Sequence, residues 1–443
     1  MEKDKYTGEE KYIIEENPEI SLGIPYFDKI TVFFPAFGNK NYVLYFLGQL
    51  ISLTGSWLQT VAQGWLVLQL TNSVLLLGVV AALSSIPSLF FSLAGGVIID
   101  RFPKKKIVIF TQFSSMMLAF IFGVLVIFNI VNIWEIFILS FLTGVVNALD
   151  YPARQAFIPE MVNKEQLPSA IALNSSTFNS ARIIGPAMAG ILIALVGTGG
   201  AFILNGASYI AVIIALLLMK VRDFVPKRHL HPVKAIKEGI HYSFHHPVIR
   251  PLLVFVGVVS IFGWSYATVM PAIAKNTFHL DASGLSYLYV ANGIGALIAT
   301  FLVSFFSKKV SPSVFILAGN TVFAIGIVLF TLTSNFHLAL FFLGLSGLGL
   351  LSQFSMMNTT VQNMVEDQLR GRVMSIYALM FIGLSPIGNF EVGWVSDRFG
   401  TSIAIQVGAV IVFFFGLIVL LNLNKINRNY DIYLKKMGLV NKA

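Results

Sequence analysis

The sequence has no cysteine and few charged residues, and both shortages restrict what the protein can be. Without cysteine there are no disulfides, no cysteine-ligated iron–sulfur clusters and no thiolate zinc sites. Charged residues make up 12% of the 443 residues, whereas a soluble domain usually carries about a quarter. Hydrophobic residues make up 56%, and the mean hydropathy is +0.79. Such a chain cannot cover its surface with polar groups, so we expect its main solvent to be lipid.

Further absences exclude whole classes of function. The chain has no Gly-x-x-x-x-Gly-Lys-Ser/Thr phosphate loop and no His-Glu-x-x-His helix, and its serines lack paired bases. We therefore expect neither ATP hydrolysis nor any other enzyme activity, and no cofactor. His241, His245 and His246 lie close together, but no carboxylate or cysteine pattern accompanies them, so we interpret them as interfacial polar residues and expect no metal. The net charge of +9 does not indicate nucleic acid, because the cytoplasmic loops of membrane proteins concentrate Lys and Arg.

Long apolar runs are the main feature that is present. A spanning helix needs about 20 mostly apolar residues, and twelve such runs are separated by turn residues. Six runs lie in each half of the chain: 43–69, 74–99, 107–128, 133–156, 168–196 and 200–219, then 250–274, 284–306, 313–333, 337–361, 371–395 and 402–423. The sequence therefore predicts an all-α membrane protein made of a bundle at 43–219 and a bundle at 250–423.

Basic residues orient these spans. With both termini in the cytoplasm, 27 of the 30 Lys and Arg residues lie on the cytoplasmic side, Lys275 and Arg398 lie outside, and Arg182 lies within a span. The positive-inside rule therefore favours this topology. The linker at 220–249 is basic, and its apolar residues recur every four positions, which predicts an amphipathic helix on the cytoplasmic face.

The two tails differ in charge. We expect no cleavable signal peptide, because residues 1–28 hold eight acidic and three basic side chains. The polar tail at 1–42 and the basic tail at 424–443 are both predicted to be cytoplasmic.

Asp-Arg-Phe occurs twice, at Asp100 and at Asp397. A weak internal repeat relates QAFIPEMV at 155–162 to NTTVQNMV at 358–365, an offset of 203 residues. The two aspartates are 297 residues apart, so they are not repeat partners. The predicted topology puts Asp100 on the cytoplasmic side and Asp397 outside, and we interpret Asp397-Arg398 as an external turn.

Several motifs in order resemble the major facilitator superfamily. GVIIDRFPKKK at 96–106 resembles its cytoplasmic loop signature, although Pro103 stands where the family usually has Gly. ARIIGPAMAGIL at 181–192 resembles the Gly-Pro element of its antiporters and exporters. YPARQAFIPEMV and RGRVMSIYALMFIGLSPIG resemble the branch that contains enterobactin-type siderophore exporters and macrolide efflux proteins. The resemblance covers 43–423 and implies twelve transmembrane helices in two six-helix bundles, the major facilitator fold.

The resemblance implies an inner gate around the loop signature. In the family this aspartate meets the cytoplasmic end of helix 11, which here carries Arg372. Asp150, at the cytoplasmic end of the fourth span, is the expected partner of Arg101 and Lys104. We predict that the gate residues lock the outward-facing state: Gly96, Asp100, Arg101, Lys104, Asp150 and Arg372.

The fifth span carries small residues and an arginine. Gly185, Pro186 and Gly190 permit a kink and close packing against a neighbour, and the resemblance implies export. Arg182 lies deep in the span, so it should face the bundle interior or a wet cavity. It is either a binding group for an anionic or polar substrate, or a structural hydrogen-bond hub.

The central cavity and the coupling group are predicted from polar residues in the spans. Helices 1, 4, 7 and 10 line the cavity in the family, and the pocket is expected to be largely apolar. Its candidate residues are Trp57, Gln59, Gln63, Asn147, Trp264, Tyr266, Gln353, Asn358 and Tyr377. Glu391 is the deepest carboxyl within a span by this topology and is the candidate for proton coupling, or else an interfacial residue.

The sequence as a whole predicts a secondary active transporter of the prokaryotic inner (plasma) membrane. We expect a monomer that exports small amphipathic molecules, coupled to a cation gradient, with protons as the expected ion. Its partners are the lipid bilayer and the small-molecule substrate. The alternatives are an importer or a lipid-moving homologue of the same fold, or a membrane sensor or assembly partner that no longer moves solute.

Overall fold

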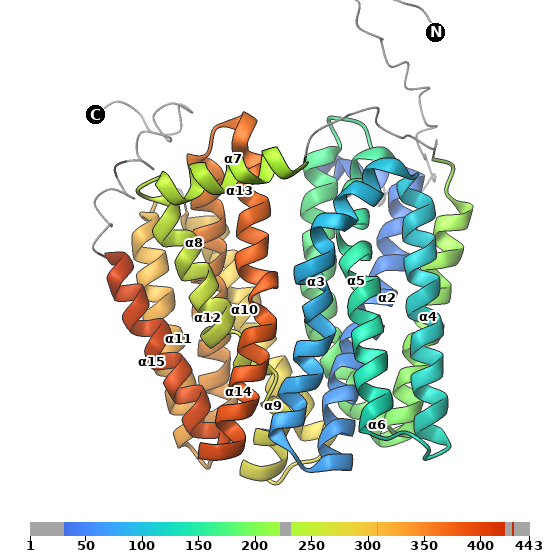
Figure 1. Cartoon of the computed structure of the whole chain (residues 1–443), viewed down its shortest axis with the longest axis vertical. Helices are drawn as coiled ribbons and strands as arrows, with labels where there is room; N and C mark the ends of the chain where they lie inside the picture. Colours follow the sequence, from blue (N-terminus) through green and yellow to red (C-terminus); the bar gives the residue numbers. More distant parts are fainter. Residues whose placement is uncertain (1–30, 222–231, 308, 421–427, 429–443) are drawn as a thin grey trace, which may run out of the picture.

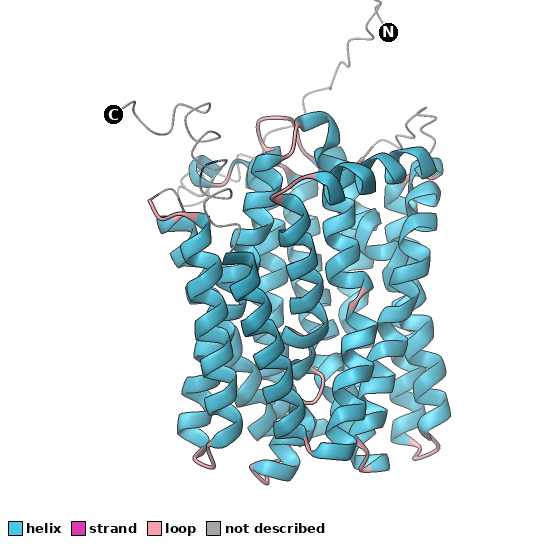
Figure 2. Cartoon of the chain, turned by 60° about the vertical axis from the view of Figure 1, so that its left-hand side comes forward, coloured by secondary structure: helices cyan, strands magenta, loops and turns pink. Residues whose placement is uncertain are grey.

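The computed structural model describes residues 31–221, 232–307, 309–420 and 428, without the side chains of residues 92–98, 100, 232–237, 367–368 and 420. Within these ranges the chain is helical and contains no strand (Figure 2). The predictions for the tail at 424–443, and for most of the tail at 1–42, lie outside the described residues. The same holds for the predicted roles of the Gly96 and Asp100 side chains.

The first bundle contains six membrane-crossing helices in five continuous elements. After a short 3-10 turn, η1 (Pro35–Gly38), these are α2 (Lys40–Thr71), α3 (Val74–Arg101), α4 (Lys104–Ile127), α5 (Ile133–Met161) and α6 (Leu167–Leu218). α6 is two crossings joined at Gly197, whose φ of 72° lies in the left-handed region that glycine adopts without strain. The predicted turn at 197–200 is thus a sharp break between two helices.

The second bundle forms the other half of the molecule (Figure 1). α7 (Pro232–His245) lies across one end of this bundle and contacts α8 and α13. The seventh crossing consists of α8 (Ile249–Val258), η2 (Val259–Gly263), η3 (Ser265–Ala267), α9 (Met270–Ala272) and η4 (Ile273–Thr277). The remaining elements are α10 (Ala282–Phe306), α11 (Pro312–Leu332), α12 (Phe336–Met364), α13 (Asp367–Ala378), η5 (Leu379–Gly383), α14 (Ser385–Phe399) and α15 (Thr401–Leu420).

Counting crossings confirms the predicted fold class. Ten helical segments of the described chain are long and apolar enough to cross a membrane, and α6 is one of them although it crosses twice. The 32-residue α2 is also long enough, but its Gln, Ser and Thr residues lower its mean hydropathy. The total is twelve crossings in two six-helix bundles.

Two crossings of the second bundle are less regular than the sequence predicts. In the seventh, η2 and η4 are π-helical turns. In the eleventh, the π-helical turn η5 separates α13 from α14. A π-turn inserts one residue into the helix and changes the direction in which later side chains point. Both irregular crossings lie beside the other bundle, because α9 of the seventh contacts α2 and η5 of the eleventh contacts α3.

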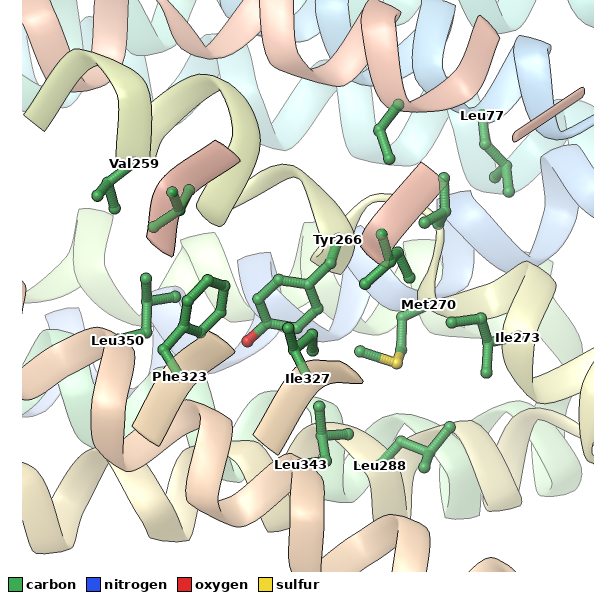
Figure 3. Packing of buried hydrophobic residues seen from close by; sticks show 14 of the residues in the cluster. Leu77, Val259, Tyr266, Met270, Ile273, Leu288, Phe323, Ile327, Leu343 and Leu350 are labelled. Carbon is green, nitrogen blue, oxygen red and sulfur yellow. The ribbon is translucent and has the colours of Figure 1, made fainter. Parts of the chain in front are cut away.

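We call the end of the molecule at which α7 lies the linker end, and the opposite end the far end. The two bundles meet along α3 and α14 and along α6 and α10. Where α3 crosses α14, Gly78 faces Gly393, and a Cβ built on either glycine would lie 2.9 Å from the Cα of the other. The apolar core is continuous across this contact, since Leu77 of α3 belongs to the same cluster as Met270 and Ile273 (Figure 3).

Candidate functional site

A small pocket lies between the two bundles near the middle of the spans. It has a volume of about 70 Å³. The first bundle contributes one residue of α2 and two of α6, and the second contributes the irregular seventh crossing, α10 and α12. The lining residues are Trp57, Arg182, Pro186, Trp264, Tyr266, Ala267, Tyr289, Asn292, Gly293, Ala296, Gly347, Leu350 and Leu351. The pocket is therefore aromatic and apolar, and Arg182 is its one charged lining residue within the described chain.

Arg182 points from α6 across the pocket toward the second bundle. Its guanidinium carbon lies 5.8 Å from the centre of the Trp264 ring, a cation–π distance. Among the described residues it has no carboxylate partner and no hydrogen-bond acceptor. The interpretation of Arg182 as a hydrogen-bond hub therefore has no support in the described residues, whereas its position in the pocket fits a binding group.

Small residues of α6 bring the pocket walls together. Gly185 lies against α2, where a Cβ would come within 2.5 Å of the Trp57 Cβ. Gly190 lies against α10, where a Cβ would come within 2.6 Å of the Ser283 Cα. Pro186 lies between these two contacts and lines the pocket. α6 thus packs closely against one helix of each bundle, and the absence of side chains at Gly185 and Gly190 makes this possible.

Irregular backbone positions the aromatic residues of the second bundle. Trp264 follows the π-turn η2, and its ring packs against Phe354 and Phe381 at centroid distances of 5.9 and 5.4 Å. Tyr266 lies in η3, and its hydroxyl accepts a hydrogen bond of 2.7 Å from the Asn292 side chain. Trp57, Trp264 and Tyr266 were all predicted from the sequence as cavity residues, and all three line this pocket.

The other predicted cavity residues lie elsewhere. Gln59 accepts a hydrogen bond from Asn205 (2.6 Å) and Gln63 donates one to Ser140 (2.8 Å), so both amides join helices within the first bundle. Gln353 is fully buried beside Gly319, and its amide has no hydrogen-bond partner among the described residues. The remaining three are Asn147, which is exposed, Asn358, which accepts from Gln362, and Tyr377, which is buried and donates to the Phe354 carbonyl.

A buried ionic cluster in the first bundle was missed by the sequence analysis. Asp150 and Arg154 form an ion pair of 2.7 Å within α5, and Arg154 also donates to Gln49 at 2.7 Å. Thr111 and Gln112 of α4 donate to the Asp150 carboxylate at 2.6 and 2.9 Å. The signal was present, because an acid and an arginine four residues apart share one face of a helix.

Arg154 also lines a second cavity, about 140 Å³ in volume, on the linker-end side of the first bundle. Its walls come from α2, α5 and α6: Tyr45, Leu53, Tyr151, Arg154, Gln155, Asn174, Ser175, Phe178 and Asn179. This cavity is more polar than the central pocket.

The predicted gate residues whose side chains are described form no ion pair or hydrogen bond with one another in this conformation. Lys104 pairs with Glu160 at 3.1 Å, and Asp150 pairs with Arg154 rather than with Arg101 or Lys104. Arg372, at the linker end of the second bundle, pairs with Glu238 of α7. Arg101 is exposed.

Glu391 lies in α14 and is partly exposed. It lines neither cavity, and it has no hydrogen bond or ion pair with any described residue.

Polar contacts between described residues of the two bundles lie in the middle of the spans and at the far end. Lys275, in the last turn of the seventh crossing, donates to the Asn72 side chain at 2.9 Å and to the Leu68 carbonyl at 3.4 Å. Near the middle, Asn389 of α14 donates to Ser85 of α3 at 3.4 Å. No hydrogen bond or ion pair joins described residues of the two bundles at the linker end. The Lys275 contact and the Gly78–Gly393 crossing hold the bundles together at the far end, which we call the closed end.

Two six-helix bundles that enclose a pocket, with one end closed, define a transporter of the major facilitator superfamily. The profile of the transmembrane secretion effector family matches residues 31–434, and the chain belongs to this family.

The chain resembles individual transporters over most of their length. It is 28% identical to the staphyloferrin A transporter of Staphylococcus aureus over 364 residues, which cover 80% of this chain and 89% of that protein. It is 23% identical to the enterobactin exporter EntS of Citrobacter koseri over 385 residues, which cover 86% and 92%.

Solved structures share the fold at low sequence identity. A bacterial homologue of the human lysosomal transporter Spinster, inward-facing and unoccupied, aligns with a TM-score of 0.68 at 13% identity, covering 89% of this chain and 97% of that one. A bacterial homologue of the iron transporter ferroportin, also inward-facing, aligns with a TM-score of 0.64 at 15% identity, covering 87% and 98%.

Proposed function

We propose that the chain is a proton-coupled exporter that moves a small amphipathic molecule, of the siderophore or drug type, across the bacterial plasma membrane by alternating access. That it is a membrane transporter follows from its family; the direction, the coupling ion and the substrate are the proposal. Two relatives, a transporter of staphyloferrin A and an exporter of enterobactin, support the siderophore type and, for the second, export.

The observation that carries the proposal is the aromatic pocket between two bundles whose contacts are unequal at the two ends. Rocking of one bundle against the other would open the pocket to alternate sides. We assign the linker end to the cytoplasm, because 27 of the 30 basic residues then lie inside. The far end is then external, and the conformation described here is the inward-facing one, in which an exporter takes up its substrate.

An inner gate completes the proposed cycle. In the outward-facing state, Asp100 would meet the linker end of the eleventh crossing, and Arg372 would leave Glu238. If Asp100→Asn leaves both transport and the ratio of inward- to outward-facing molecules unchanged, the gate proposal is wrong.

Proteoliposomes test the transport proposal. The purified full chain is reconstituted, inside-out molecules are selected by their accessible linker end, and uptake of labelled enterobactin and staphyloferrin A is measured with and without an imposed proton gradient. Uptake that a proton gradient drives and an uncoupler abolishes is the expected result. Protein-free liposomes are the control.

Each alternative gives a different outcome in the same vesicles. Transport only from the external side identifies an importer, and movement of labelled phospholipid identifies a lipid-moving homologue. No exchange of any solute identifies a non-transporting sensor or assembly partner. Gradient-insensitive exchange refutes proton coupling, and Glu391→Gln should convert coupled transport into such exchange if Glu391 carries the proton.

A further inference from the structure

Arg154 and Arg182, which lie in membrane-spanning helices of the first bundle, have opposite surroundings. The Arg154 guanidinium is neutralised by Asp150 and also bonds to Gln49. The Arg182 guanidinium contacts the face of Trp264 and has no acid or acceptor among the described residues. An arginine within a bilayer normally pairs with an acid or with backbone carbonyls, because a lone charge there is costly.

The pocket provides what is needed to bind an anion at Arg182. Trp57 and Trp264 form apolar walls beside the guanidinium, and they exclude water and so strengthen an ionic contact. Small residues, Gly293, Ala296 and Gly347, form part of the opposite wall. The Asn292 amide, which donates to the Tyr266 hydroxyl, adds hydrogen-bonding capacity.

From this geometry we propose that the transported molecule is an organic anion and that Arg182 binds its carboxylate, while Trp57 and Trp264 pack against its apolar or aromatic part. A guanidinium presents paired N–H donors that match the two oxygens of a carboxylate. The pocket volume of about 70 Å³ accommodates a charged group and its immediate neighbours, so the rest of a larger substrate would extend toward the open linker end. This inference rests on the proposed transport function and adds the substrate's charge and the residue that selects it.

Binding is tested on the full-length protein in detergent, with two pairs of probes that differ only in charge: benzoate and benzamide, and salicylate and salicylamide. Thermal stability is followed by the loss of the monodisperse peak, because a ligand that binds the folded state raises the unfolding temperature. The wild type should bind each acid at least about tenfold more tightly than its neutral amide. Arg182→Gln should remove this preference, and Arg182→Lys should keep it at reduced affinity, because the charge remains but the paired donors are lost.

If Arg182→Gln does not fold, the comparison of acid and amide binding by the wild type still tests the inference. Equal binding of acid and amide by the wild type, or an unchanged preference in a folded Arg182→Gln variant, overturns the inference. A preference for inorganic phosphate or for phosphatidylglycerol over the carboxylates also overturns it, in favour of phosphate recognition.

Transport assays separate this inference from the proposed function. If the Arg182→Gln variant transports enterobactin and staphyloferrin A at the wild-type rate, Arg182 does not select the substrate, yet the chain is a transporter. If the wild type binds acids through Arg182 but moves no solute, the anion site stands and the transport function fails.

Discussion

Lys275 of the second bundle donates a hydrogen bond of 2.9 Å to the side chain of Asn72, the residue that ends α2 of the first bundle. Its ammonium also reaches the Leu68 carbonyl at 3.4 Å, so a positive charge lies at the C-terminal end of a helix, where the helix dipole stabilises it. This contact joins the bundles at the far end, and it is one of the contacts that must break before the pocket can open there.

Removing this contact should shift the conformational equilibrium. A hydrogen bond to a charged group contributes roughly 1.5–3 kcal/mol, and solvent at this partly exposed site reduces that to about 1 kcal/mol. Lys275→Gln should therefore raise the population that is open at the far end about fivefold. The chain has no cysteine, so Ala296→Cys in the pocket gives a single reporter, and its labelling by an impermeant maleimide from the far-end side measures the opening.

Arg398 is the matched control for this change, because its guanidinium stacks on Trp394 of its own helix, 4.7 Å from the ring centre. Arg398→Gln removes a basic residue near the same end without touching the contact between bundles. Equal labelling in the two variants would refute a closing role for Lys275.

Breaking the Asp150–Arg154 pair should destabilise the fold strongly. Asp150 is 2% exposed, and its replacement by Ala leaves a buried guanidinium without its counter-charge. Such a loss costs about 3–5 kcal/mol, which should appear as a large fall in the unfolding temperature in detergent. Arg372→Gln is the comparison, because the Arg372–Glu238 pair is more than a third exposed at its acid and should contribute well under about 1 kcal/mol. Similar losses in both variants would contradict this ranking.

Gly190→Ala should lower the transport rate, because it disturbs the contact between the two bundles. Its new Cβ would lie 2.6 Å from the Ser283 Cα, so α6 and α10 would have to separate along the contact between bundles. We expect a several-fold fall in transport rate and weaker far-end closure, measured in proteoliposomes and with the same cysteine reporter. Gly371→Ala has open space around its new Cβ and should be neutral or slightly stabilising, because alanine is the better helix former.

The stability of the linker end should depend on His246. Burial lowers the pKa of its imidazole below the usual value, and Nδ1 accepts hydrogen bonds from the Val248 and Ile249 backbone at 3.3 and 3.2 Å. A neutral ring is therefore favoured in the folded state. The stabilisation is fully present above the unfolded pKa of about 6.5 and is lost as the pH falls through that value toward the lower folded pKa.

Thermal unfolding between about pH 5 and pH 8 checks this dependence. His246→Asn should reduce the fall of the unfolding temperature at acid pH. The control is His337→Asn, at the start of α12, which should leave that fall unchanged. If the His246→Asn variant still loses thermal stability at acid pH as the wild type does, another group causes that loss.

The fold could be predicted to a large extent, because its determinants are local. Twelve apolar runs, their turns and the asymmetry of Lys and Arg follow from the requirements of a bilayer, and the break at Gly197 lies inside the turn that the sequence predicts at 197–200. The π-turns η2 and η5 could not be predicted, because one inserted residue leaves the apolar pattern unchanged. Yet η2 precedes Trp264 and Tyr266, so it affects where both aromatic rings point.

The site was predicted only in part, for the same reason. Three of the predicted cavity residues, Trp57, Trp264 and Tyr266, line the pocket, whereas Gln59 and Gln63 turn inward to bond with neighbouring helices. Depth in a span follows from position in the chain, but direction around the helix axis depends on which faces meet.

By itself, the sequence determined that this is a membrane protein, how many times the chain crosses the membrane and which residues lie deep in it. Hydropathy and charge act on each segment separately, so these properties can be read segment by segment. The tertiary structure alone decided that Arg182 lies in the pocket between the bundles, without a counter-charge among the described residues. Arg154 has an acid four residues away on its own helix and an amide on α2, whereas Arg182 faces a pocket that only the meeting of two bundles creates. The surroundings of Arg182 depend on distances between helices of the two bundles, and those distances are set by packing.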